Sequence, residues 1–185
     1  MAAPGERVLD VCAAPGGKST AIAVTGAFVV GADLQAHRVA LVAQNAASLG
    51  TPDVAPLVAD GTQQPFAPAS FHHVLLDAPC SGLGTLRRRS DARWRITEAD
   101  VATLTALQQQ LIDASAPLVK AGGTFTYSVC TLLAAESIEH AVPAGFSVIS
   151  EPPAGQWRPF GPGWRVLPHD AGTDGMVVVR YRRES

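Results

Sequence analysis

The chain has little of several features that would each point to a particular class of protein. Its apolar runs are too short to span a bilayer, and no cationic-then-apolar leader opens the sequence. Only three of its 185 residues are cysteine and no Cys-x-x-Cys pair occurs, which disfavours a disulfide framework and a zinc site. A net charge of −2 excludes the strong basic field of a dedicated nucleic-acid binder. We therefore expect a soluble, cytoplasmic protein that holds no metal.

Length and composition predict one domain. A chain of 185 residues with a hydrophobic content of 47% can bury a substantial core. The sequence has no internal repeat and no low-complexity tract that would divide it. We therefore assign residues 1–185 to a single domain and expect it to be a monomer.

Short apolar runs alternate with segments of helical periodicity. The apolar runs predict seven strands, at residues 8–11, 28–32, 54–58, 74–76, 124–129, 146–149 and 176–181. Spacing and capping signals predict helices from about residue 18, over 35–49, behind a capping box at 97–100, and over 134–141. Residues 152–168, rich in Pro, Gly and Trp, are expected to form a surface loop. The alternation predicts an α/β fold with a doubly wound, mostly parallel, seven-stranded sheet.

In such a fold the ligand lies outside the carboxyl ends of the strands, so the residues that follow each strand are the candidates for chemistry. Four carboxylates and all three cysteines occupy these positions: Asp10, Cys12, Asp33, Asp60, Asp77, Cys80 and Cys130. Asp33 follows the second strand, where a carboxylate can accept both hydroxyls of a ribose. The plain alternatives are a solvated helix-capping Asp33 and an ordinary Asp-Gly turn at Asp60. The placement of these seven residues at strand ends predicts a functional site along the carboxyl edge of the sheet, which we call the rim.

The turn after the first strand reads Cys-Ala-Ala-Pro-Gly-Gly-Lys over residues 12–18. Its glycines let a ligand approach the backbone, and free N–H groups at the start of a helix favour polar or anionic partners. Gly17, Lys18 and Ser19 form the tail of a phosphate-binding loop, but that motif needs glycine at position 12, which holds Cys12. The dinucleotide fingerprint Gly-x-Gly-x-x-Gly is absent. Neither nucleotide motif therefore accounts for the whole turn.

All seven residues of this turn match motif I of the Sun-type S-adenosylmethionine-dependent RNA cytosine-5 methyltransferases, a family that the chain resembles over nearly its whole length. The resemblance implies S-adenosylmethionine as cofactor, with Asp33 on the ribose and Asp60 on the adenine side. The cofactor-binding residues that it implies are Cys12, Ala13, Ala14, Pro15, Gly16, Gly17, Lys18, Asp33, Arg38, Asp60 and Asp77. A solvated lysine at the helix start is the plain alternative for Lys18.

Two further segments carry the resemblance and contain the other two cysteines. Residues 77–82, Asp-Ala-Pro-Cys-Ser-Gly, match motif IV. Residues 127–131, Tyr-Ser-Val-Cys-Thr, resemble motif VI. The one departure is Val129, which stands where family members usually carry Thr. Addition of a thiolate at C6 of cytosine makes the neighbouring C5 nucleophilic. Chemistry alone leaves the two thiols exchangeable, and buried thiols can also simply pack as small apolar groups. The resemblance implies Cys130 as nucleophile, Cys80 in product release, and Asp77 on the base.

A cluster of arginines follows motif IV. Five of the 14 Lys and Arg residues lie between positions 87 and 95. A solvated charged face is the usual explanation of such a run, but here it would overhang the base pocket and could bind phosphates, with an aromatic ring available for stacking. The predicted RNA-binding residues are Pro79, Arg87, Arg88, Arg89, Arg93 and Trp94.

Together these features predict transfer of a methyl group from S-adenosylmethionine to C5 of a cytosine in RNA, with ribosomal RNA as the expected substrate. The family's RNA-binding region precedes motif I, so we expect this domain to lack it. Two alternatives remain open from the sequence. One is a phosphate-loop hydrolase of ATP or GTP with magnesium, and the other is a cofactor- or RNA-binding module without activity of its own.

Overall fold

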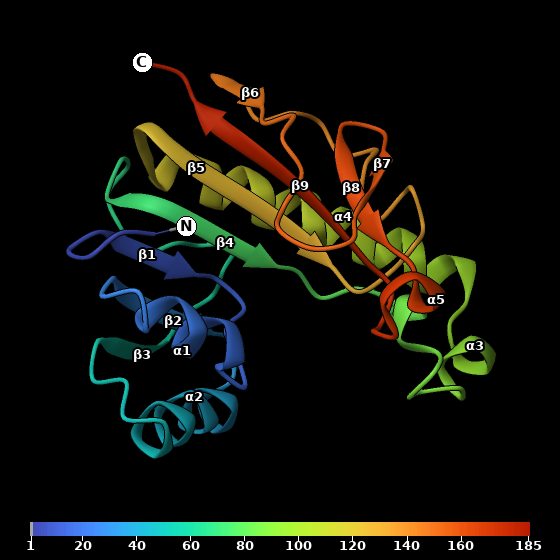
Figure 1. The fold of residues 1–185 in the computed structure, drawn as a ribbon, viewed down its shortest axis with the longest axis horizontal. Helices are drawn as coiled ribbons and strands as arrows, with labels where there is room; N and C mark the ends of the chain where they lie inside the picture. Colours follow the sequence, from blue (N-terminus) through green and yellow to red (C-terminus); the bar gives the residue numbers. More distant parts are fainter. Residues whose placement is uncertain (1) are drawn as a thin grey trace.

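The protein was analysed as a computed structural model, which describes residues 2–185 (Figure 1). In chain order its elements are β1 (Arg7–Asp10), α1 (Gly17–Ala23), β2 (Phe28–Asp33), α2 (Ala36–Ser48), β3 (Val54–Val58), β4 (Phe71–Asp77), η1 (Leu83–Thr85), α3 (Ala92–Arg95), α4 (Glu98–Ser115), η2 (Ala116–Leu118), β5 (Val119–Val129), β6 (Phe146–Val148), β7 (Arg158–Phe160), β8 (Gly163–Val166), α5 (Pro168–Ala171) and β9 (Met176–Arg183). Among the residues that the structure describes, no helix is long and apolar enough to cross a membrane.

The strands form one sheet in the order β3-β2-β1-β4-β5-β9-β8-β7, and β6 also pairs with β9. The first five strands pair in parallel, whereas the pairs made by β6 to β9 are antiparallel. Helices α1 and α2 lie on one side of the sheet and α4 on the other (Figure 1). The predicted doubly wound α/β architecture is confirmed, and the order of the strands changes direction between β1 and β4.

The sheet has nine strands rather than the predicted seven. The two additional strands, β7 and β8, form a hairpin within residues 152–168, which were expected to form a loop. The Gly content of this segment predicts a loop, but Gly163 lies in the strand β8. A Cβ atom at Gly163 would lie 2.5 Å from the carbonyl oxygen of Val178 on β9, so only glycine permits this close pairing.

The predicted helix over residues 134–141 is also absent. The segment forms turns in which the N–H groups of Ser137, Ile138 and Glu139 all point to the carbonyl oxygen of Ala134. The carbonyl oxygen of Glu136 accepts from the phenol of Tyr127 and not from an N–H one turn later. A hydrogen bond from the side chain of Tyr127, nine residues earlier, therefore takes the place of a helical hydrogen bond at Glu136.

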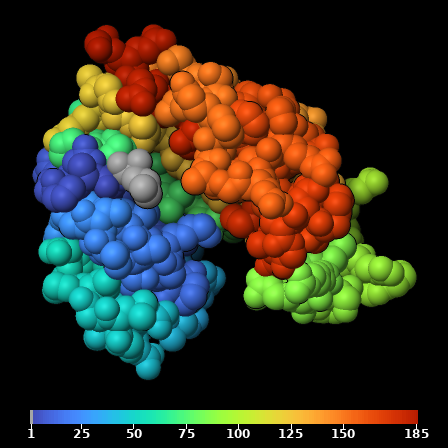
Figure 2. Space-filling model, viewed as in Figure 1, coloured from blue at the N-terminus to red at the C-terminus, as the bar shows by residue number. Residues whose placement is uncertain are grey.

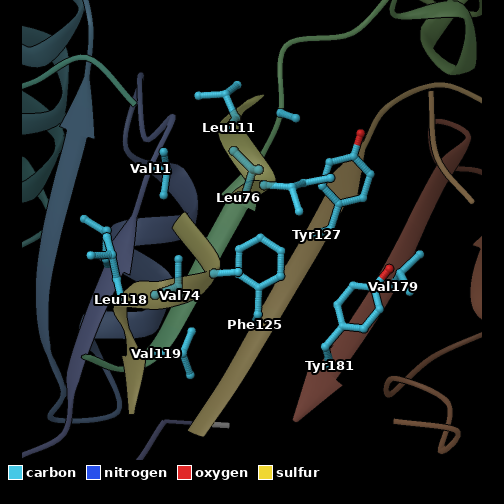
Figure 3. Packing of buried hydrophobic residues seen from close by; sticks show 14 of the residues in the cluster. Val11, Val74, Leu76, Leu111, Leu118, Val119, Phe125, Tyr127, Val179 and Tyr181 are labelled. Carbon is cyan, nitrogen blue, oxygen red and sulfur yellow. The ribbon is translucent and has the colours of Figure 1, made fainter. Parts of the chain in front are cut away.

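The predicted helix behind residues 97–100 is confirmed as α4. Thr97 and Asp100 form a capping box: the Asp100 N–H donates to Thr97 Oγ1 at 3.2 Å, and the Thr97 N–H donates to Asp100 Oδ2 at 2.9 Å. Leu111 and Ile112 of this helix pack on the sheet beside the aromatic rings of β5 and β9 (Figure 3). This core fixes the carboxyl ends of β4 and β5, from which the chain enters the predicted site.

Candidate active site

A cleft of about 1080 Å³ opens at the carboxyl ends of the parallel strands. In the space-filling view it lies between the N-terminal part of the chain, in blue, and the green and red segments opposite (Figure 2). The predicted site residues that line it are Cys12, Ala14, Pro15, Lys18, Asp33, Arg38, Asp60, Asp77, Pro79, Cys80, Arg88, Arg89 and Cys130. The predicted site residues that are not part of the lining are Ala13, Gly16, Gly17, Arg87, Arg93 and Trp94.

The turn of residues 12–18 is held close to β2 and α2. Ala13 is buried, and its N–H donates to the carbonyl oxygen of Ala32 at 2.8 Å. Gly16 has a φ of 105°, and a Cβ atom there would lie 3.1 Å from Cα of Val42, so glycine is required on both counts. By contrast, nothing lies within 4 Å of a Cβ atom built on Gly17. Ala13 and Gly16 therefore shape the turn, whereas a side chain at position 17 would have room.

Asp33 and Arg38 form a pair at the end of β2. The side chain of Asp33 is 8% exposed, and its Oδ2 lies 3.3 Å from Nε of Arg38. The Asp33 carboxylate also accepts from the N–H of Gln35 at 3.3 Å, and the Arg38 guanidinium donates to the carbonyl oxygen of Ala14 at 3.2 Å. Arg38 therefore links the carboxylate to the turn of residues 12–18.

Asp60, on the loop after β3, shapes its own turn as well as lining the cleft. Its Oδ1 accepts from the N–H of Thr62 at 2.9 Å and from the Thr62 hydroxyl at 2.7 Å. These two hydrogen bonds lower the pKa of the Asp60 carboxyl, so the group is ionised near neutral pH. A turn of this kind is the plain alternative for Asp60, and the structure combines it with a place in the cleft.

Lys18 and Asp77 join the start of α1 to the end of β4. Lys18 Nζ lies 2.6 Å from Oδ2 of Asp77, while Oδ1 of Asp77 accepts from the hydroxyl of Ser128 at 3.0 Å. Both side chains are partly exposed in the cleft, at 43% and 31%. The pair therefore presents a lysine ammonium and an oriented carboxylate to whatever occupies this part of the cleft.

Burial changes the acid–base behaviour of the first strand end. It raises the pKa of Asp10 to about 6, although a hydrogen bond from Ser19 at 2.7 Å opposes this effect. Burial, with the nearby carboxylate of Asp10, also raises the pKa of Cys12 to about 12. Cys12 is thus a neutral thiol near pH 7, which fits a packing role and not a nucleophilic one.

Cys80 and Cys130 stand side by side on neighbouring strand ends. Cys80 follows β4 and Cys130 follows β5, and their sulfur atoms are 3.4 Å apart. The hydrogen bond from Cys80 lowers the pKa of Cys130 to about 7, against the opposing effect of burial. The same bond, together with burial, raises the pKa of Cys80 far above that of a free thiol. The two shifts have opposite directions, so Cys130 is the thiol of the pair that ionises more readily.

The arginine segment is partly tied to the loop before β9. Arg87 donates to the carbonyl oxygen of Gly172, and Arg88 forms an ion pair with Asp174. On α3, the guanidinium of Arg93 lies 4.9 Å from the centre of the Trp94 ring, whose residue is 80% exposed. The segment thus has an anchored part beside the cleft and an exposed part farther out on α3.

Sequence reasoning missed a buried polar cluster behind the two thiols, formed by Ser81, Gln108, Thr131, Glu136 and His140. Gln108 gave one available signal, because it is a polar residue among the apolar positions of α4. Glu136 gave another, because it is an acidic residue among small and apolar neighbours. Neither signal identifies its partners, which are 28 to 55 residues away.

Solved structures with the same architecture define the class of protein. A crystal structure of PH0851 has a TM-score of 0.89 and 28% sequence identity, covering 99% of this chain and 43% of that chain. The crystal structure of NSun6 from Pyrococcus horikoshii with SFG has a TM-score of 0.79 and 26% identity, covering 97% of this chain and 48% of that chain. The fold is that of a Rossmann-like, class I methyltransferase.

The family follows from the sequence. The family model of the 16S rRNA methyltransferases RsmB/F matches residues 2–182, and the chain belongs to this family, as the Sun-type resemblance predicted. A probable ribosomal RNA small subunit methyltransferase B from a Synechocystis species is 41% identical over 97% of this chain. The chain spans 44% of the length of that relative.

Proposed function

We propose that this domain transfers a methyl group from S-adenosylmethionine to C5 of a cytosine in ribosomal RNA, through a transient bond between the sulfur of Cys130 and C6 of the base. The observation that carries the proposal is the pair of thiols 3.4 Å apart at the ends of β4 and β5. They share one cleft with the strand-end carboxylates of the family's cofactor side. Membership of the RsmB/F family favours this chemistry over hydrolysis of a nucleotide.

The cofactor side of the cleft fits S-adenosylmethionine. The Asp33 carboxylate, at the end of β2, is oriented by Arg38 where a ribose would be bound. When bound, S-adenosylmethionine supplies an electrophilic methyl group. Asp33 would accept hydrogen bonds from the ribose hydroxyls, and Asp60 would lie towards the adenine.

The base side of the cleft supplies the nucleophile and its orientation. The Cys130 thiolate forms a bond to C6, and the electron pair of the C5–C6 double bond moves so that C5 becomes nucleophilic. Asp77, whose carboxylate is oriented by Lys18 and Ser128, would hold N3 or the exocyclic N4 of the cytosine. After the methyl group is in place, a base takes the C5 proton, and the electron pair of the C5–H bond re-forms the C5–C6 double bond as the Cys130 thiolate leaves C6. Cys80, the protonated partner, assists this release.

The arginine segment would bind the RNA chain. Arg88 and Arg89 lie on the wall of the cleft, and Arg93 and Trp94 extend from α3, where phosphates and an unpaired base could be bound. Pro79 lines the same cleft beside Cys80 and would contact the base edge. The anchoring of Arg87 and Arg88 to the loop before β9 gives this surface a fixed position relative to the thiols.

The test is nucleoside mass spectrometry of ribosomal RNA after incubation with the protein and S-adenosylmethionine. We expect 5-methylcytidine with the wild-type protein and none with Cys130→Ala. If this domain proves inactive alone, the same pair is compared in the full-length protein. Methylation at another atom, or at C5 by Cys130→Ala, would refute the proposed reaction. Tight binding of ATP with magnesium, and none of S-adenosylmethionine, would instead favour the hydrolase alternative.

A further inference from the structure

A buried polar cluster lies directly behind the two thiols, and the chemistry proposed above makes no use of it. Its members, none more than 9% exposed, are Ser81, Gln108, Thr131, Glu136 and His140. Glu136 lies at the centre and is fully buried. Within residues 2–185, no Lys, Arg or His forms an ion pair with it. Burial of a carboxylate without a cationic partner is costly, so its retention calls for a reason.

The carboxylate of Glu136 holds the residue that follows Cys80. Its Oε1 accepts from the N–H of Ser81 at 2.8 Å, and its Oε2 accepts from the Ser81 hydroxyl at 2.5 Å. The Ser81 hydroxyl also lies 3.1 Å from that of Thr131, the residue that follows Cys130. One carboxylate therefore connects the two loops that carry the thiols.

A second contact fixes the other side of Cys80. The side-chain amide of Gln108 donates to the carbonyl oxygen of Pro79 at 2.8 Å and to Oε1 of Glu136 at 3.3 Å. His140 Nε2 lies 3.1 Å from the amide oxygen of Gln108 and orients this side chain in turn. Cys80 thus lies between two residues that are both held by the cluster.

We propose that Glu136 is a positioning residue that, through Ser81 and Gln108, holds the sulfur of Cys80 within hydrogen-bond distance of the sulfur of Cys130. The inference rests on the proposed function only in naming Cys130 as the nucleophile. It assigns to Glu136 a role in catalysis without contact to substrate or cofactor.

The charges around the thiols agree with this role. The pKa of Cys80 is raised mainly by its hydrogen bond with Cys130 and by burial, and the negative charge of Glu136 adds to the effect. The hydrogen bond between the two sulfurs is also the main cause that lowers the pKa of Cys130, so it depends on Cys80 being held beside Cys130. A thiolate that forms near neutral pH is the reactive form of cysteine.

The remaining titratable groups near the cluster do not compete for this charge. Burial lowers the pKa of His140 and raises that of the Tyr127 phenol, so both are neutral near pH 7. On the other side of the thiols, Asp77 raises the pKa of Cys130 and Lys18 lowers it, and these two form an ion pair with each other. Glu136 is therefore the negative group that the structure places behind the Cys80 loop.

The test measures the rate of alkylation by iodoacetamide from pH 5.5 to 9.5, with mass spectrometry to assign the labelled cysteine. In the wild-type protein we expect labelling at Cys130 with a midpoint near pH 7. Glu136→Gln should release the Cys80 loop and weaken the hydrogen bond between the two sulfurs, which raises the Cys130 midpoint by about one unit, slows Cys130 labelling about tenfold below the midpoint, and exposes Cys80 to label. Loss of the carboxylate charge without release of the loop would instead lower the midpoint, and that result would contradict the proposal. Glu139→Gln, which changes an exposed acidic residue of the same segment, should behave as the wild type.

Ser81→Ala provides a second, milder variant that removes one of the two bonds from Ser81 to Glu136. It should shift the Cys130 midpoint in the same direction, and it decides the question if Glu136→Gln does not fold. An unchanged midpoint together with an unchanged Cys80:Cys130 labelling ratio in the folded variants overturns the proposal. The measurement needs neither RNA nor cofactor, so its failure is distinguishable from failure of the methyl-transfer reaction.

Discussion

Lys18 Nζ and Asp77 Oδ2 lie 2.6 Å apart and connect the start of α1 with the end of β4. Both residues line the cleft, and in the proposed function this ion pair lies between the cofactor and the base. Because both side chains are partly exposed, the pair contributes little to folding. Its position instead suits it to hold the base and to place charge beside the Cys130 thiolate.

We therefore expect replacements in this pair to separate activity from stability. Asp77→Asn should reduce methylation by about 10–10²-fold, because a hydrogen bond to a charged group contributes about 1.5–3 kcal/mol. Lys18→Met should change the free energy of unfolding by no more than about 1 kcal/mol. The measurements are single-turnover methylation and urea unfolding. Arg158→Met, which breaks an ion pair outside the cleft, is the control and should keep its activity.

Asp33 provides a prediction for the cofactor side. Asp33→Asn preserves the shape of the side chain but removes the charge that would accept from the ribose hydroxyls. Calorimetric affinity for S-adenosylmethionine should fall by about 1.5–3 kcal/mol, the value of a hydrogen bond to a charged group. Asp53→Asn changes an exposed carboxylate just before β3 and should not affect binding. An affinity for Asp33→Asn equal to that of the wild type would remove Asp33 from the cofactor site.

The arginine segment should contribute to RNA affinity through charge. Replacing Arg89 and Arg93 together by Gln should reduce the slope of log K against log salt concentration by up to about 1.4, at about 0.7 per phosphate contact on a single strand. These two are preferable to Arg87 and Arg88, whose structural contacts would confuse the result. The measurement is fluorescence anisotropy with labelled RNA over a range of salt concentrations.

The control for this experiment replaces two exposed arginines, Arg7 and Arg182, at the other end of the parallel strands. The paired replacement changes the net charge of the protein by the same amount as the test variant. Equal slopes for the two double variants would mean that the segment is a solvated face.

The predictable parts of the molecule are those that short segments determine by themselves. The strand that ends at Asp10 and the one that ends at Asp33 are bounded apolar runs, and parallel pairing brings their last residues to one edge of the sheet. This is why the rim of carboxylates and cysteines follows from the pattern of apolar runs alone. The capping box at Thr97 and Asp100 is equally local.

The parts that escaped prediction depend on partners far away along the chain. Gly163 lies in a strand because its backbone packs closely against β9, whereas the sequence around it indicates only a loop. The turns at residues 134–141 arise because Glu136 bonds to Ser81, 55 residues earlier. Spacing within a segment carries no information about such a contact, so neither the missing helix nor the buried cluster could be derived from it.

Asp10 should make stability depend on pH in an unusual direction. Burial raises its folded-state pKa to about 6 from an ordinary value of 3.8, and its Oδ1 has no hydrogen-bond partner. Between about pH 4 and pH 6 the folded state therefore holds more protons than the unfolded state, and the contribution of Asp10 to stability falls as pH rises. At pH 7 the penalty is fully present.

Asp10→Asn removes this penalty and keeps an acceptor for Ser19. The variant should be more stable than the wild type at pH 7 by on the order of 2 kcal/mol, with the difference disappearing towards pH 4. Urea unfolding of both proteins at pH 4.5, 5.5 and 7 gives the difference in their free energy of unfolding at each pH. The titration of all other groups is common to both proteins and cancels from this difference. A constant difference over that range would show that Asp10 does not titrate there.

Cys80 and Cys130 should give different covalent products when each is replaced. Cys130→Ala has no nucleophile and should form no adduct with RNA. Cys80→Ala retains the nucleophile but lacks the neighbouring S–H group, so elimination of Cys130 from C6 should be slow and RNA should remain attached to the protein. The measurement is a denaturing gel after incubation with RNA and S-adenosylmethionine, in the full-length protein if this domain alone is inactive.

The double variant Cys80→Ala, Cys130→Ala serves as the control, because any adduct it forms must come from another residue. An adduct in Cys130→Ala and none in Cys80→Ala would exchange the roles of the two thiols. That exchange would also place the thiolate on the cysteine whose pKa is raised by its hydrogen bond with Cys130 and by burial. If neither single variant forms an adduct and both methylate normally, the covalent mechanism is wrong. The adduct pattern therefore tests at once the reaction and the division of charge between two sulfur atoms 3.4 Å apart.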